Sequence, residues 1–304
     1  MRSRYLYPSP ALITRIETDT GHRLSSAREV GAVYSCGKME GMSESELTQV
    51  PDKYRYDYAG VCWWCGGTAD SREHKWKRSE VVNLFGRGSY GDSVVWVHDD
   101  TAESLRGPKA SGLMFSPSLC TSCNGTRSQP FDRAYERLSD YFIANHPSLI
   151  EQQYIDLADV YGDEVNEQLP NLARYYGKHI GCRVADHAGR VPDDLRSFLD
   201  GDADNAPSVY SEMGVRELLL SVVDDDGEPA MGLSLRKSVA HYSETPGVGL
   251  TTFKSGVGIG AIEFLYDVNL DPDRTNTGNG ILTARVQPLW SHGEDLYTHK
   301  FVVL

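Results

Sequence analysis

CWWCGG at residues 62–67 and CTSCN at residues 120–124 are the two stretches that decide the fold. Each holds two cysteines separated by two residues, so that one tight turn can aim both sulfurs at a single ion. Two such pairs complete the tetrahedral sulfur site that Zn²⁺ prefers. We therefore predict a structural zinc site, rather than a disulfide, a redox pair or an iron–sulfur cluster. Its ligands are Cys62, Cys65, Cys120 and Cys123.

The segment between the two cysteine pairs is 54 residues long, which exceeds the spacing of a simple zinc ribbon. It begins with the charged run DSREHKWKR at residues 70–78. The adjacent carboxylate and imidazole of Glu73 and His74 suit metal-assisted phosphodiester hydrolysis. A carboxylate can hold Mg²⁺, and a neutral histidine can take a proton from water. Neighbours in a strand point to opposite faces, so a kink or a strand end is needed for both to serve one site.

The order of these motifs resembles that of a known enzyme family. CxxC, then Glu-His, then CxxC-Asn with Arg127 three residues beyond the asparagine is similar to an HNH endonuclease of the zinc-bearing kind, one of the ββα-metal or His-Me finger nucleases. The likeness covers about residues 60–140. It implies a β-hairpin followed by a helix around one divalent ion.

The resemblance assigns a role to each matching residue. His74 corresponds to the general base, and Glu73 and Asn124 correspond to the ligands of a catalytic Mg²⁺ or Mn²⁺. We expect five basic side chains to contact nucleic acid: Arg72, Lys75, Lys77, Arg78 and Arg127. The family's middle asparagine, which orients the histidine, has no clear match. Asn83 lies close to His74 in sequence, and Ser116 or Ser118 are the alternatives.

The charge of the chain is unevenly distributed. The net charge is −13, but residues 1–59 carry eight basic and eight acidic side chains, and residues 60–140 carry ten of each. Residues 141–304 carry 12 basic and 25 acidic side chains. The part that resembles a nuclease is therefore neutral and can present a basic face to phosphates, whereas the second half repels them. We expect that acidic half to dock a protein partner or to restrain cutting, and the alternative is the solvated surface of a structural domain.

The pattern along the chain predicts an α+β fold. We expect an N-terminal extension packing on the nuclease at residues 1–59, with a strand at 11–16, and a zinc-braced ββα-metal finger nuclease domain at 60–145. Phe131, Tyr135, Leu138 and Phe142 lie at helical spacing. At 146–304 we expect an acidic domain, first helical, with a short helix at 192–199, and then β-rich. Its antiparallel sheet has about five strands, at 215–223, 231–239, 257–268, 281–289 and 299–304.

These observations predict a metal-dependent HNH endonuclease that hydrolyses nucleic acid, DNA rather than RNA. The resemblance favours a role in anti-phage defence or restriction. No apolar run is long enough to span a membrane and no signal peptide is evident, so we expect a cytoplasmic protein without a membrane partner. The alternatives are a non-catalytic zinc-knuckle module that binds nucleic acid or protein, and an interaction protein whose functional surface is the acidic half.

Overall fold

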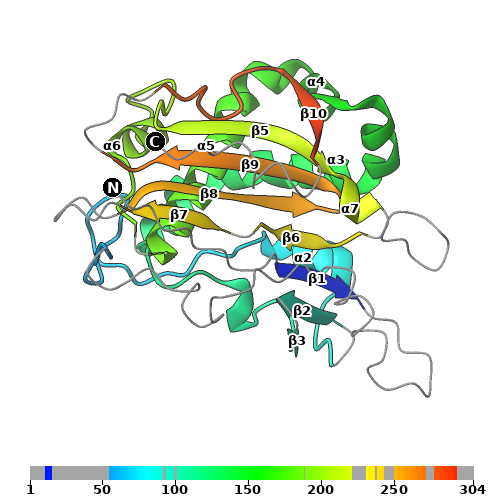
Figure 1. Cartoon of the computed structure of the whole chain (residues 1–304), viewed down its shortest axis with the longest axis horizontal. Coiled ribbons are helices and arrows are strands. Elements are labelled where there is room, and N and C mark those ends of the chain that lie inside the picture. Colours follow the sequence, from blue (N-terminus) through cyan, green and yellow to red (C-terminus); the bar gives the residue numbers. More distant parts are fainter. Residues whose placement is uncertain are drawn as a thin grey trace, which may run out of the picture.

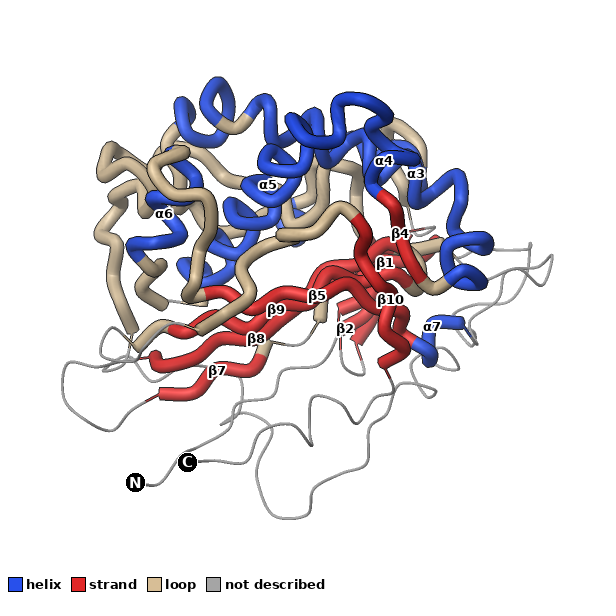
Figure 2. The backbone as a smooth tube through the Cα atoms, turned by 90° about the horizontal axis from the view of Figure 1, so that it is seen from above, coloured by secondary structure: helices blue, strands red, loops and turns tan. Residues whose placement is uncertain are grey.

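The protein folds as a mixed sheet with helices on one face (Figures 1 and 2). The computed structural model describes residues 11–15, 55–91, 94–98, 101–187, 189–220, 231–236, 238–242, 250–271 and 277–292. No helix in these ranges is both long enough and apolar enough to cross a membrane. The expected strand at 299–304 and the expected N-terminal extension, apart from residues 11–15 and 55–59, lie outside them.

Strands from both halves of the chain form the sheet. Within the described residues it has ten strands in the order β3-β2-β1-β6-β8-β9-β5-β10-β4, and β7 also pairs with β8. The strands are β1 (Ala11–Arg15), β2 (Val94–His98), β3 (Thr101–Ser104), β4 (Tyr154–Asp156), β5 (Val209–Arg216), β6 (Leu233–Leu235), β7 (Val239–Tyr242), β8 (Leu250–Ile259), β9 (Ile262–Asn269) and β10 (Val286–His292). Because β1 pairs with both β2 and β6, it joins the region of the nuclease-like motifs to the second half.

The structure corrects the expected antiparallel sheet in two respects. First, β10 pairs with β5 in parallel, so the sheet is mixed. Second, the apolar run at 257–268 is not one strand but the inner part of a hairpin, in which Ile259 pairs with Ile262. Gly260 takes a left-handed φ of 55° at the turn. A continuous apolar run conceals a two-residue turn when both of its strands are buried, as β8 and β9 are.

Other expected elements end at different residues. The expected strand at 215–223 starts earlier, as β5, and gives way to a helix after Arg216. The segment 231–239 divides into β6 and β7, and residues 281–285 precede β10 without joining it. The strand expected at 11–16 and the helix expected at 192–199 are confirmed as β1 and α6.

Helices α3, α4, α5 and α6 lie over one face of the sheet (Figure 2). The helical elements are α2 (Arg78–Phe85), η3 (Ser111–Leu113), η4 (Cys123–Arg127), α3 (Gln129–Gln152), α4 (Leu157–Tyr161), η5 (Gly162–Glu164), α5 (Val165–Asp186), α6 (Asp193–Asp200) and α7 (Glu217–Leu220). The predicted stripe on α3 is confirmed, since Phe131, Tyr135, Leu138 and Phe142 are all buried. This face packs α3 against α5.

The core continues across the predicted boundary near residue 145. Tyr135 of α3 stacks on Tyr175 of α5 with ring centroids 3.8 Å apart, and Tyr176 stacks at the same distance on Phe264 of β9. The indole N–H of Trp76 donates to the Ser234 carbonyl of β6 over 3.2 Å. The motif region, the helices and the sheet therefore share one apolar core.

Candidate functional site

The four cysteines converge as predicted. Their sulfur atoms all lie within 4.8 Å of one another, and all four thiols are free. The Sγ atoms of Cys65 and Cys120 are 3.6 Å apart, far longer than a disulfide bond. Four sulfurs at about 2.3 Å from one zinc ion would be separated by about 3.8 Å. The cluster can therefore hold a structural metal ion such as zinc.

Local backbone geometry places these sulfurs. The Cys62 N–H donates to the Gly67 carbonyl over 2.6 Å, and the Gly66 N–H donates to the Cys62 carbonyl over 2.9 Å, which closes the first turn. The second pair begins the helical segment that leads into α3. Asp70 accepts the Thr121 N–H over 2.7 Å and the Thr121 hydroxyl over 3.0 Å at this helix start. Each cysteine pair is thus held in place by hydrogen bonds that the other pair does not supply.

The first cysteine pair is packed onto two helices from the second half of the chain. The Trp63 ring lies over Gly181 of α5, where an added Cβ would come within 2.4 Å of the indole. The Trp64 N–H donates to Asp200 of α6 over 2.6 Å. Asp200 also pairs with Arg127, whose guanidinium lies 4.5 Å from the centre of the Trp64 ring. The turn that carries Cys62 and Cys65 therefore packs on α5 and α6.

The Glu73-His74 segment forms one side of an irregular hairpin. Ser71 pairs with Leu119 and His74 pairs with Met114, and the Phe115 N–H donates to the Glu73 carbonyl over 2.9 Å. The chain then turns through the second cysteine pair into a single π-helical turn, η4, and α3. Such turns are rare and are frequent at functional sites. Two paired extended segments followed by a helix is the local arrangement that the resemblance implied.

The imidazole of His74 is half-buried and has one free nitrogen. Burial, followed by the charges of Arg78 and Lys77, lowers its pKa below the usual value, so the ring is neutral near pH 7. The backbone of Pro108 opposes this shift and favours the protonated ring. The buried Nε2 has no hydrogen-bond partner within the described residues. A neutral imidazole has one ring nitrogen that can accept a proton.

The expected orienting side chains do not contact His74 within the described residues. Asn83 donates instead to Asp140 of α3 over 2.9 Å, and the Ser116 N–H donates to Asp186 of α5. The Ser118 hydroxyl is buried without a hydrogen-bond partner in that part of the chain. The backbone of Pro108, in the long segment that departs from the family pattern, affects the pKa of His74 instead. Any residue type could supply this backbone, so nothing in the sequence marks it.

Asn124 stands at the start of η4 and faces the Glu73-His74 segment. Its amide nitrogen donates to the Ser71 hydroxyl over 2.8 Å and to the Arg72 carbonyl over 3.1 Å. Its Oδ1 atom is buried and accepts no hydrogen bond from the described residues. A buried acceptor without a partner is rare in folded proteins and calls for an explanation. A bound cation would provide one.

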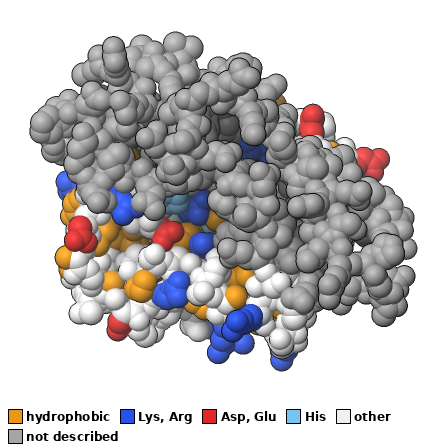
Figure 3. All heavy atoms as spheres, turned by 60° about the horizontal axis from the view of Figure 1, so that its bottom comes forward, with side chains coloured by type: hydrophobic (Ala, Val, Ile, Leu, Met, Phe, Trp, Pro, Cys, Tyr) orange, Lys and Arg blue, Asp and Glu red, His pale blue; other side chains and the backbone are white. Residues whose placement is uncertain are grey.

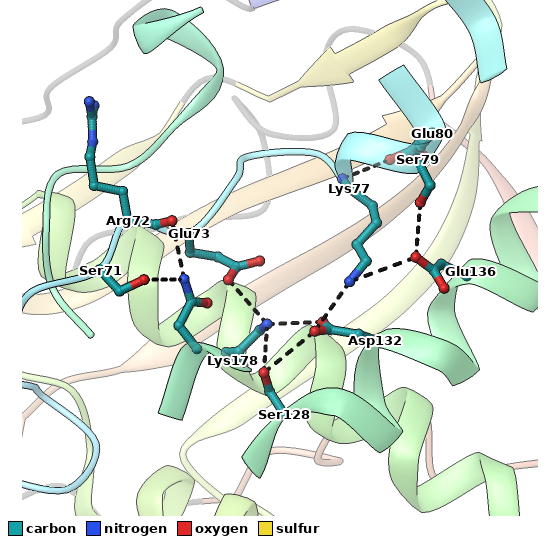
Figure 4. A network of polar contacts seen from close by, with 11 residues as sticks. Ser71, Arg72, Glu73, Lys77, Ser79, Glu80, Ser128, Asp132, Glu136 and Lys178 are labelled. Carbon is teal, nitrogen blue, oxygen red and sulfur yellow. Dashed lines mark hydrogen bonds and ion pairs between the residues drawn. The ribbon is translucent and has the colours of Figure 1, made fainter. Parts of the chain in front are cut away.

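Glu73 is 8% exposed and forms an ion pair that the sequence did not suggest. Its Oε2 accepts from the Lys178 ammonium of α5 over 3.1 Å (Figure 4). Lys178 also reaches Asp132 over 3.0 Å and the Ser128 hydroxyl over 3.3 Å. Asp132 in turn pairs with Lys77 over 3.2 Å. Burial raises the pKa of Glu73, and the neighbouring ammonium opposes this rise and favours the carboxylate.

The predicted basic contacts have different surroundings. Arg72 donates to the Phe115 carbonyl over 2.9 Å, while Arg127 and Lys77 are held by the carboxylates described above. Lys75 is half-buried, and burial lowers its pKa to about 8, so it remains mostly charged at neutral pH. Arg78 is exposed. On the face shown in Figure 3, lysine and arginine side chains lie beside a histidine.

Comparisons with protein-family models, with curated proteins and with solved structures found no match. Within the described residues, the four cysteines are also the one converging group of three or more His, Cys, Asp and Glu ligands. A catalytic ion would therefore depend on the two oxygens without hydrogen bonds from this part of the chain, Asn124 Oδ1 and the second Glu73 oxygen. Oxygen donors of this kind fit a hard divalent cation.

Proposed function

We propose that this chain is a metal-dependent endonuclease of the HNH type, braced by structural zinc, which hydrolyses phosphodiester bonds of DNA in preference to RNA. One observation carries the proposal. Burial lowers the pKa of His74 and keeps the ring neutral, its Nε2 has no hydrogen-bond partner within the described residues, and it adjoins Glu73 on a hairpin that leads into the cysteine-anchored helix. The two unbonded oxygens of Glu73 and Asn124 support a place for Mg²⁺ or Mn²⁺.

The proposed reaction uses the chain's own groups in the following way. His74 Nε2 takes a proton from a water molecule, whose oxygen attacks the phosphorus atom. The bond from phosphorus to the 3′ oxygen then breaks, and that oxygen takes a proton from solvent water, which leaves a 5′-phosphate and a 3′-hydroxyl end. Glu73 and Asn124 would hold the divalent ion, which supplies stabilisation of charge on the phosphate and the leaving oxygen. Arg78 and Lys75 offer charge to neighbouring phosphates.

The test is a cleavage assay on plasmid DNA, single-stranded DNA and RNA with Mg²⁺ or Mn²⁺. His74→Ala should lower the rate by about 10²–10⁴-fold, the usual loss for a positioned base, while zinc content and nucleic-acid binding persist. His241→Ala is the matched control, since His241 is a half-buried histidine of β7 whose Nδ1 bonds to Thr252. Cleavage by His74→Ala at the wild-type rate would refute the mechanism.

A second candidate function is a non-catalytic module that binds nucleic acid or protein through the zinc knuckle. The ion pair between Glu73 and Lys178 favours it, because a carboxylate already satisfied by a lysine needs no metal. The same assay separates the two functions. Binding without cleavage by the wild-type protein, under every metal tested, would favour the binding module. Anti-phage defence or restriction remains a proposal that rests on the resemblance.

A further inference from the structure

Lys178 is surrounded by oxygen atoms as a bound cation would be. Its ammonium lies 3.1 Å from Glu73 Oε2, 3.0 Å from Asp132 Oδ1 and 3.3 Å from Ser128 Oγ, so each of its three N–H bonds has an acceptor. The side chain is 1% exposed. The ammonium is thus surrounded by two carboxylates and a hydroxyl. Lys178 itself comes from α5, outside the stretch that resembles a nuclease.

The two carboxylates that contact Lys178 are balanced by two ammonium groups without a metal. Glu73 and Asp132 carry two negative charges, and Lys178 and Lys77 carry two positive charges (Figure 4). Lys77 also lies 3.9 Å from Glu136, which does not contact Lys178. A divalent ion placed on Glu73 would sit beside a buried ammonium. Repulsion between two cations a few ångströms apart is large where water is excluded. The Glu73 carboxylate therefore cannot bind the Lys178 ammonium and a divalent ion at full strength at the same time.

We infer that Lys178 is the resident cation of this site, which competes with the divalent ion for Glu73 and so weakens metal loading of the free enzyme. This inference rests on the proposed function only in taking Glu73 as a metal ligand. It makes Lys178 a positioning residue: it holds the carboxylate in place through one oxygen and sets the charge that the ion must overcome. Asp132 shares the ammonium and anchors it to α3.

The test measures Mn²⁺ binding to zinc-loaded protein by electron paramagnetic resonance, without nucleic acid. Lys178→Gln removes the charge but keeps hydrogen-bond donors, and should bind Mn²⁺ at least about tenfold more tightly than the wild type. Lys178→Arg keeps the charge and should bind as the wild type does. In the double variant Glu73→Gln, Lys178→Gln, the gain should disappear because the ion loses its carboxylate.

Three results would overturn the inference. They are a folded Lys178→Gln that binds Mn²⁺ no more tightly, a Lys178→Arg that gains affinity as Lys178→Gln does, and a double variant that keeps the gain. If Lys178→Gln fails to fold because its buried carboxylates lack a cation, millimolar Mn²⁺ should restore its melting transition, since the ion replaces the ammonium. Failure of Mn²⁺ to restore folding would equally overturn the inference.

The proposed function and this inference fail in different ways. If the wild type cleaves nucleic acid but Lys178→Gln gains no Mn²⁺ affinity, the nuclease stands and the role of Lys178 is wrong. If Lys178→Gln gains affinity through Glu73 but the wild type cleaves nothing, the competition stands and the nuclease is wrong.

Discussion

Two polar atoms of the candidate site are buried without a hydrogen-bond partner. His74 Nε2 and Asn124 Oδ1 accept no hydrogen bond from the described residues, although the amide nitrogen of Asn124 has two acceptors. A buried polar group without a partner costs about 1–3 kcal/mol. A chain that retains two such groups beside Glu73 fits a site whose remaining partners are a metal ion, water and substrate.

Asn124 permits a test at this scale. In Asn124→Asp, a carboxylate oxygen would replace the amide that donates to the Arg72 carbonyl over 3.1 Å, so two acceptors would face each other. We expect the free energy of unfolding to fall by about 1–3 kcal/mol. The measurement is urea unfolding without added Mg²⁺ or Mn²⁺, because a divalent ion would offset the new charge.

Asn83→Asp is the control for this change. Asn83 also donates its amide, in this case to Asp140, but its side chain is exposed, whereas that of Asn124 is half-buried and has a buried Oδ1. Water and salt screen the new repulsion there, so the loss should stay below about 1 kcal/mol. Equal losses in the two variants would show that the buried geometry of Asn124 is not what matters.

At the scale of elements, the cysteine cluster joins two segments that the chain separates widely. The first pair lies in a turn docked on α5, and the second pair starts the helix that carries Asn124. A bound metal ion would therefore fix the position of Asn124 relative to the hairpin of Glu73 and His74. The cysteine sulfurs would position the side chains of the candidate site through the backbone that joins them, without contacting those side chains.

Cys120→Ser tests this arrangement. The variant should lose its metal, whereas the wild type should contain about one zinc per chain. Structural zinc contributes on the order of 10 kcal/mol in small sites, so the melting temperature should fall by on the order of 10 °C. The control is Cys182→Ala, a buried free thiol of α5 outside the cluster, which should keep its zinc. Zinc-free wild-type protein would refute the assignment.

At the scale of the whole molecule, α5 connects the hairpin to the sheet. Lys178 binds Glu73, His179 contacts the Lys75 carbonyl over 3.0 Å, and Arg183 donates to Ser238 over 2.8 Å. A fragment that ended near residue 145 would lose all three contacts. Point substitutions in the full chain are therefore the sound way to separate the roles of the two halves.

His179 makes the stability of the whole fold sensitive to acid. Burial, followed by the charge of Arg183, lowers its pKa to about 3, whereas an unfolded histidine has a pKa of about 6.5. Between these values the unfolded chain binds one more proton than the folded chain. The free energy of unfolding therefore falls as the pH falls below about 6.5, by up to about 1.4 kcal/mol per pH unit from this residue.

The measurement is urea unfolding at several pH values between about 4 and 7. His179→Gln lacks the titrating group and should show a shallower loss of stability on acidification than the wild type. The difference in slope reports the proton that His179 excludes from the folded state. Parallel pH profiles for the two proteins would contradict a neutral, buried His179.

Structural features that depend only on residues one or two turns away in the chain could be predicted from the sequence alone. Two CxxC spacings predicted the sulfur cluster, because each pair sits in one tight turn, and apolar residues at helical spacing predicted the buried face of α3. Long-range packing, by contrast, brings Lys178 to Glu73 across 105 residues of chain and buries His74 Nε2 without a partner among the described residues. The parallel pairing of β10 with β5 could not be predicted for the same reason. Local patterns limit the conformation of a segment, whereas the partner of a buried charge or a strand edge depends on how the whole core packs.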